Sequence, residues 1–169
     1  YPERWTPPLQ SIYKVNFAGS VFWDADACGV GVGVVIRDWK GEFVAALAKF
    51  LPELIDPSTA CFFAVKCAIE FADECCFSHI VVEGEAPSTI IHELQSILEG
   101  PSPEPSTARS LILREAKGRM MQLSSCVFSA VKTSANVAAH KVAEYARNVV
   151  DEQVWLMEGP DFLIDILLA

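Results

Sequence analysis

The first fifty residues constrain the fold more than any other part of the sequence. Residues 29–37 read GVGVGVVIR, and a run of valine and isoleucine with small residues between them is typical of a strand. Residues 38–42 (DWKGE) are a glycine-containing turn signal, and residues 43–50 are predicted to return as the next strand. Because residues 12–17 alternate apolar and polar side chains, the chain is predicted to begin with three consecutive antiparallel strands.

Strands and helices alternate in the rest of the chain. Helices are predicted at 57–75, 87–98, 110–123 and 135–149, and short strands at 78–82 and 126–131. Pro57 opens the first of these helices, with either Asp56 or Ser58 as its N-cap. The order β-β-β-α-β-α-α-β-α predicts an α/β fold in which helices flank one five-stranded mixed sheet.

The whole chain, residues 1–169, is predicted to be one domain, with an extended lead-in at 1–11 and a C-terminal tail at 150–169. The apolar share of 51% is enough to build a full core. No apolar run is long enough to span a membrane, and the apolar tail segment 162–168 is a candidate for self-association. The six cysteines lack the spacing of metal or disulfide motifs, which favours free thiols in the nucleus or the cytoplasm.

Several short motifs occur in an order that resembles the ribonuclease H-like domain of plant and retrotransposon-derived proteins. They cover nearly the whole chain: residues 5–8 (WTPP), 14–19 (KVNFAG), 29–41, 82–85 (VEGE) and 136–143 (NVAAHKVA), then Trp155 and Pro160. The resemblance implies the ribonuclease H-like fold. In active members of that family, carboxylates at the centre of the sheet hold two divalent metal ions that activate water for cleavage of an RNA–DNA hybrid.

At the positions that match the family's metal ligands, most carboxylates are missing. Ala18 stands where the first strand carries its aspartate, and Cys61 stands where the first helix carries its glutamate. Glu85 replaces a shorter aspartate, while Asn136 and His140 fit the pattern of the last helix. Magnesium prefers ionised oxygen ligands. The resemblance therefore implies a degenerate site that binds metal weakly or not at all, with Glu85 and His140 as the remaining ligand candidates.

Charge gives a mixed indication about nucleic acid. The net charge of −9 repels a polyanion, although a local basic groove can overcome such repulsion. Thr133 occupies a position where the family carries a basic residue, so one phosphate contact is lost. One basic cluster on the third predicted helix is either a phosphate-binding face or a solvated helix surface: Arg109, Arg114, Lys117 and Arg119.

Two aromatic residues of the first predicted helix are candidates for contact with a partner. Phe62 precedes Lys66 by four residues and so shares the polar face of that helix, with Phe63 beside it. This pair is either an exposed aromatic patch for a protein partner or a packing contact against a loop or Trp5. Asn136 is a further candidate for contact with a partner or with nucleic acid.

Three functions stay open at this point. The leading hypothesis is a catalytically impaired ribonuclease H-like module that acts in binding or regulation, through a protein partner or weakly through nucleic acid. The alternative is a divergent RNA–DNA hybrid ribonuclease that uses Mg²⁺ or Mn²⁺ held by Glu85, His140 and a recruited acid such as Asp24. A retroelement relic without a selected role is the third. No cofactor is expected, because the GVGVG pattern lies within a strand and not before a helix.

Overall fold

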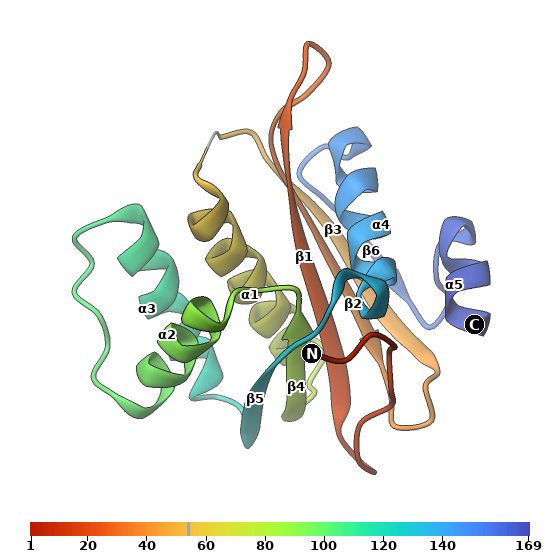
Figure 1. The fold of residues 1–169 in the computed structure, drawn as a ribbon, viewed down its shortest axis with the longest axis horizontal. Coiled ribbons are helices and arrows are strands. Elements are labelled where there is room, and N and C mark those ends of the chain that lie inside the picture. The colour runs from red at the N-terminus through yellow and green to blue at the C-terminus, as the bar shows by residue number, and fades with distance from the viewer. Residues whose placement is uncertain (54) are drawn as a thin grey trace.

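A computed structural model describes residues 1–53 and 55–169 and arranges them around one mixed sheet with helices on both of its faces (Figure 1). The elements are β1 (Tyr13–Trp23), β2 (Cys28–Arg37), β3 (Phe43–Leu51), α1 (Pro57–Glu74), β4 (His79–Gly84), α2 (Ser88–Glu99), α3 (Ala108–Met120), β5 (Ser125–Ala130), α4 (Val137–Tyr145), β6 (Glu152–Leu156) and α5 (Ile164–Leu168). The strand order across the sheet is β5-β4-β1-β2-β3-β6. This confirms the predicted α/β fold.

The first three strands form the antiparallel half of the sheet, as predicted. The turn between β2 and β3 closes because the Asp38 carboxylate accepts hydrogen bonds from the backbone N–H groups of Lys40 and Glu42, each at 2.9 Å. Strand β1 runs six residues further than the predicted end at residue 17, because its second half stays paired with β2 as far as Trp23 and Cys28. The long β1–β2 hairpin therefore projects past the rest of the sheet (Figure 1).

Helices α1 and α4 cover opposite faces of this sheet. The side chains of Val15 and Phe17 in β1 belong to the core with α1, whereas Ala18 packs with Ala139 and Ala143 of α4. Helix α1 begins where Asp56 accepts a hydrogen bond from the Thr59 backbone N–H at 3.0 Å, so Asp56 is the N-cap. The two faces differ, because α1 buries large side chains such as Ile69 and Phe71 as well as alanines, whereas α4 buries mainly alanines.

The predicted number of five strands was wrong, because the sheet has a sixth. Strand β6 lies in the segment that was predicted as a tail and pairs antiparallel with β3, from Ala45 opposite Leu156 to Lys49 opposite Glu152. Its side chains are mostly exposed, so they lack the alternation that marks a half-buried strand. Trp155 packs edge-on against Tyr145 at a centroid distance of 5.5 Å, which fixes this edge of the sheet to α4. Among the described residues, no helix is long and apolar enough to cross a membrane.

The glycines of β2 allow α4 to lie directly on the sheet. A Cβ atom at Gly33 would lie 2.2 Å from the Ala139 carbonyl oxygen and 2.4 Å from the Ala143 nitrogen. These are backbone atoms, so α4 itself would have to move. We expect Gly33→Ala to lower the free energy of unfolding by about 1–3 kcal/mol through overpacking.

Urea denaturation would measure this effect, with Gly118→Ala as the matched control. A Cβ at Gly118 in α3 meets no atom within 4 Å. In a helix, replacing glycine with alanine raises the free energy of unfolding by up to about 1 kcal/mol. Opposite signs for the two glycine substitutions are the expected outcome, and a neutral Gly33→Ala would contradict the close contact between α4 and β2.

Candidate functional site

One pocket of about 250 Å³ brings together the four positions that match the family's metal ligands. Ala18 comes from β1, Cys61 from α1, Glu85 from the residue after β4, and His140 from α4. Because β1 and β4 are parallel and Phe17 pairs with Gly84, the Ala18 and Glu85 positions lie at the same level of the sheet. Asn136 also lines this pocket. The structure therefore assembles residues that are up to 122 positions apart in the sequence, from Ala18 to His140.

Glu85 and His140 contact each other in this pocket. The Nε2 atom of His140 lies 3.1 Å from Oε2 of Glu85, and both side chains remain partly exposed. His140 is placed by the first turn of α4, where its backbone N–H donates to the Asn136 carbonyl at 3.2 Å. The pair offers one carboxylate and one imidazole to whatever enters the pocket.

The other two positions offer no ligand for a hard cation. Ala18 is 4% exposed and ends in a methyl group. Burial raises the pKa of the Cys61 thiol to about 11, so this group stays protonated at neutral pH. Within residues 1–53 and 55–169, no cluster of three or more His, Cys, Asp or Glu side chains has the geometry to hold a metal ion. Magnesium demands near-octahedral oxygen coordination, so the residues present do not fit a two-metal centre.

Comparison with known proteins identifies the family of this chain. A family model described as "Reverse transcriptase-like" matches residues 16–146. The chain belongs to the reverse transcriptase-like family. No curated protein matches the sequence.

Solved structures that resemble this reverse transcriptase-like chain share its fold at low sequence identity. The RNase H1 of Halobacterium salinarum is 18% identical, with a TM-score of 0.64 over 81% of this chain and 98% of that one. The N-terminal RNase H domain of a Mycobacterium tuberculosis protein is 12% identical, with a TM-score of 0.66 over 81% and 94%. The PFV RNase H domain is 15% identical, with a TM-score of 0.61 over 83% and 95%. The ribonuclease H-like fold predicted from the motifs is thereby confirmed.

In this reverse transcriptase-like domain, Asp24 does not line the pocket. It lies at the tip of the β1–β2 hairpin, where both of its carboxylate oxygens accept hydrogen bonds from Arg147, at 2.8 and 2.7 Å. The hydrogen bond from Arg147 holds the pKa of Asp24 below its usual value. The structure thus gives Asp24 a contact that ties the hairpin to the segment after α4, away from the pocket in which the alternative hypothesis would use it.

The basic cluster on α3 is not a free phosphate-binding face. Arg109 pairs with Glu93 of α2, and Arg119 pairs with Asp73 of α1 at 2.9 Å. Lys117 is 8% exposed and donates to the Gly100 carbonyl. Arg114, which donates to the Pro103 carbonyl at 3.3 Å, is also held within the domain. The four cations therefore hold α3 against α1, α2 and the loop before α3. The sequence of α3 alone does not reveal these partners.

Of the two alternatives left open for Phe62 and Phe63, the structure fits packing within the domain, because the two side chains are buried at 0% and 9% exposure. The Arg109 guanidinium covers the Phe62 ring at 4.6 Å from its centroid. Phe62 lies on the polar side of α1, and α3 covers it there. Asn136 is likewise 1% exposed and donates to the Phe17 carbonyl at 2.9 Å, so it is not a surface contact.

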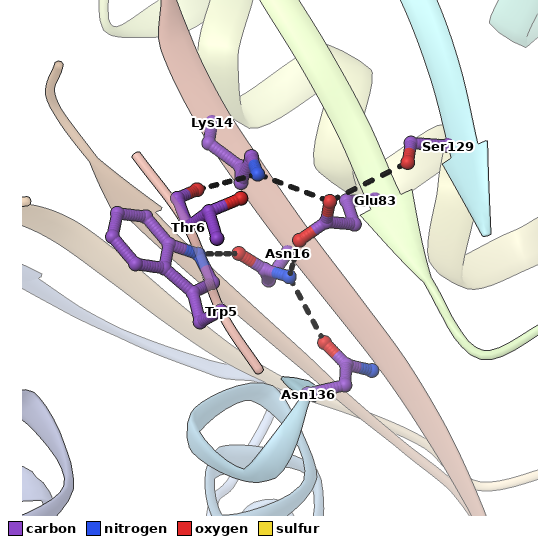
Figure 2. Close-up of polar contacts among 7 residues, drawn as sticks. All are labelled: Trp5, Thr6, Lys14, Asn16, Glu83, Ser129 and Asn136. Atoms are coloured by element: carbon purple, nitrogen blue, oxygen red, sulfur yellow. Dashed lines mark hydrogen bonds and ion pairs between the residues drawn. The ribbon is translucent and has the colours of Figure 1, made fainter. Parts of the chain in front are cut away.

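A buried polar network beside the pocket was missed by the sequence reasoning (Figure 2). Lys14 and Glu83 form a buried ion pair of 3.1 Å, and the Asn16 amide donates to Glu83 at 3.0 Å and to Asn136 at 3.2 Å. The Trp5 indole donates to the Asn16 amide oxygen at 2.9 Å, which fastens the lead-in to β1. All of these residues except Asn136 lie in the motifs WTPP, KVN and VEGE. The occurrence of the three motifs in one chain was therefore the sequence signal that could have indicated this network.

Proposed function

We propose that this chain is a catalytically impaired ribonuclease H-like module that acts by binding, of the kind found in plant and retrotransposon-derived proteins. The observation that carries the proposal is the composition of the pocket, which offers a methyl group at Ala18 and a protonated thiol at Cys61. Hydrolysis by two metal ions needs a carboxylate that bridges both ions. The Glu85–His140 pair alone does not supply that set of ligands.

A protein partner or, more weakly, a nucleic acid is the proposed binding target. The four basic side chains of the α3 cluster contact other parts of the domain and the net charge is −9, both of which disfavour tight binding to a polyanion. One similar structure, LC11-RNase H1, is solved in complex with an RNA/DNA hybrid, at 18% identity and a TM-score of 0.54. The hybrid is therefore the nucleic acid to test. The described cysteines are free, which fits a reducing compartment such as the nucleus or the cytoplasm.

The test is cleavage of a labelled RNA–DNA hybrid in Mg²⁺ and then in Mn²⁺, beside single-stranded RNA and duplex DNA. We expect no metal-dependent cleavage, because the bridging carboxylate is missing at Ala18. Fluorescence anisotropy with the same hybrid, at low and at high salt, measures binding separately from cleavage.

The opposite outcome favours a divergent ribonuclease built on the Glu85–His140 pair. Hybrid-specific cleavage that Glu85→Ala abolishes would overturn the proposal. Glu144→Ala is the matched control, since Glu144 is an exposed acid of α4 outside the pocket. Cleavage that survives Glu85→Ala would point to a contaminating nuclease, and the activity would then not be assigned to this chain.

A further inference from the structure

A second and larger cavity, of about 750 Å³, lies between the lead-in, the end of β2, the start of α4 and α5. It shares no lining residue with the pocket around Glu85 and His140. Its lining includes the polar side chains of Arg4, Trp5, Arg37 and Asp165 and the apolar side chains of Ile166 and Leu167, the last three from α5. Cavities of about 300–1,000 Å³ with a few polar groups on an apolar wall are typical of small-molecule sites.

Arg37 is the unusual residue of this cavity. It is 6% exposed, and its buried Nε atom has no hydrogen-bond partner. Throughout residues 1–53 and 55–169, no carboxylate comes within 4.0 Å of the Arg37 nitrogens. Burial lowers the pKa of Arg37 to about 10, with Glu83 acting in the opposite direction, so the group is charged at neutral pH.

Among the described residues, no hydrogen bond from an Arg37 nitrogen to a protein acceptor is present, and only Nε is fully enclosed, so the two terminal nitrogens remain reachable from the cavity. The Arg37 guanidinium carbon lies 3.9 Å from the centroid of the Trp5 ring, and the ring face stabilises the cation. An aromatic face does not accept the directed hydrogen bonds of a guanidinium. A buried charged group without such bonds is costly. An oxyanion in the cavity would accept hydrogen bonds from the terminal nitrogens of Arg37, because a guanidinium binds carboxylate and phosphate oxygens through charge-assisted hydrogen bonds.

We propose that this cavity binds a small organic monoanion, a carboxylate with an apolar body, that accepts hydrogen bonds from Arg37. Two lining side chains are cationic, Arg4 and Arg37, and one is anionic, Asp165, which together complement a single negative charge. Ile166 and Leu167 supply the wall for the apolar body. Asp165 disfavours a phosphate dianion at the same place, since like charges repel across a short distance.

Isothermal titration calorimetry with benzoate tests the site, beside benzyl alcohol and inorganic phosphate. Benzyl alcohol keeps the ring without the charge, and phosphate keeps the charge without the ring. We expect benzoate to bind with one site per chain, and to bind at least about tenfold more tightly than either control compound, which is about 1.4 kcal/mol. Quenching of tryptophan fluorescence that Trp5→Phe removes would locate the compound beside Trp5.

Substitutions then distinguish binding of benzoate in the cavity from adventitious binding elsewhere on the domain. Arg37→Met is expected to weaken benzoate binding by about tenfold or more, through loss of charge-assisted hydrogen bonds. Since Arg37 is buried, Arg4→Ala at the exposed rim provides a second measurement that leaves the core intact, and it is expected to weaken binding by a smaller factor. Arg114→Ala on α3 makes the same change in net charge away from the cavity and serves as the control.

Each of the following results would overturn the proposal. They are the absence of benzoate binding up to about 10 mM, equal affinity for benzoate and benzyl alcohol, and full affinity in a folded Arg37→Met variant. Tighter binding of phosphate than of benzoate would likewise contradict a site for an organic monoanion. None of these outcomes depends on hybrid cleavage, so the fate of this proposal is independent of the proposed function.

Discussion

Replacing Lys14 with methionine is expected to lower the free energy of unfolding by about 3–5 kcal/mol, a large share of the stability of a domain. The ammonium of Lys14 lies 3.1 Å from the Glu83 carboxylate, and the two side chains are 8% and 4% exposed. The methionine leaves the buried Glu83 carboxylate without its ion-pair partner, and Arg37 then acts on it only from beyond 4.0 Å. The change also removes the 2.6 Å hydrogen bond from Lys14 to the Thr6 carbonyl, which holds the lead-in against β1.

Urea denaturation of three variants isolates this effect. The double variant Lys14→Met/Glu83→Leu removes both charges and is expected to recover much of the loss, because an apolar pair fits a buried position without an unpaired charge. Recovery stays partial, since Asn16 loses its acceptor at 3.0 Å. Lys49→Met is the control: Lys49 and Glu152 are 3.9 Å apart and partly exposed, so this pair contributes at most about 1 kcal/mol. If Lys14→Met and Lys49→Met lower the free energy of unfolding equally, Glu83 is not held as a buried charge.

The fold was predictable where local pattern and tertiary packing agree. The valine run of β2 and the turn at Asp38 define a hairpin by themselves, and the alanine-rich face of α1 is buried as its spacing indicates. Strand β6 was not predictable in this way, because an exposed edge strand needs only a partner strand and carries little pattern of its own. The order of the motifs was informative about the pocket, which brings Ala18, Cys61 and His140 together as the resemblance implies.

One physical feature decides between the alternatives that the sequence left open at Phe62 and at the basic cluster. Both depend on how α3 docks against α1, through Arg109 over the Phe62 ring and through Arg119 with Asp73. The helical period of α1 assigns Phe62 to the same side as Lys66, but α3 covers that side. Local periodicity holds no information about a contact between residues that are 46 or 47 positions apart, so the sequence alone left open whether Phe62 is exposed and whether the basic face is free.

Placing carboxylates at two positions of the pocket is expected to give tighter magnesium binding than that of the unsubstituted chain. In Ala18→Asp/Cys61→Glu, two new acids face Glu85 and His140 across a pocket of about 250 Å³. Without metal, the variant should be less stable, because both acids enter a largely buried environment where like charges repel. Magnesium relieves this repulsion by coordinating the carboxylate oxygens. At about 100 times its Kd, the ion should raise the melting temperature of the variant by roughly 5–10 °C.

The control is Ala18→Asn/Cys61→Gln, which has the same shapes without the charges and should show no response to magnesium. Calorimetric titration with Mg²⁺ gives the stoichiometry directly, and adding Glu85→Gln to the carboxylate variant should weaken binding again. If the acidic and the neutral pairs respond alike, the carboxylates do not converge, and the backbone around Ala18 has diverged together with the side chains. Convergence, in contrast, would mean that the backbone of this pocket positions side chains at 18 and 61 well enough to hold a metal ion together with Glu85.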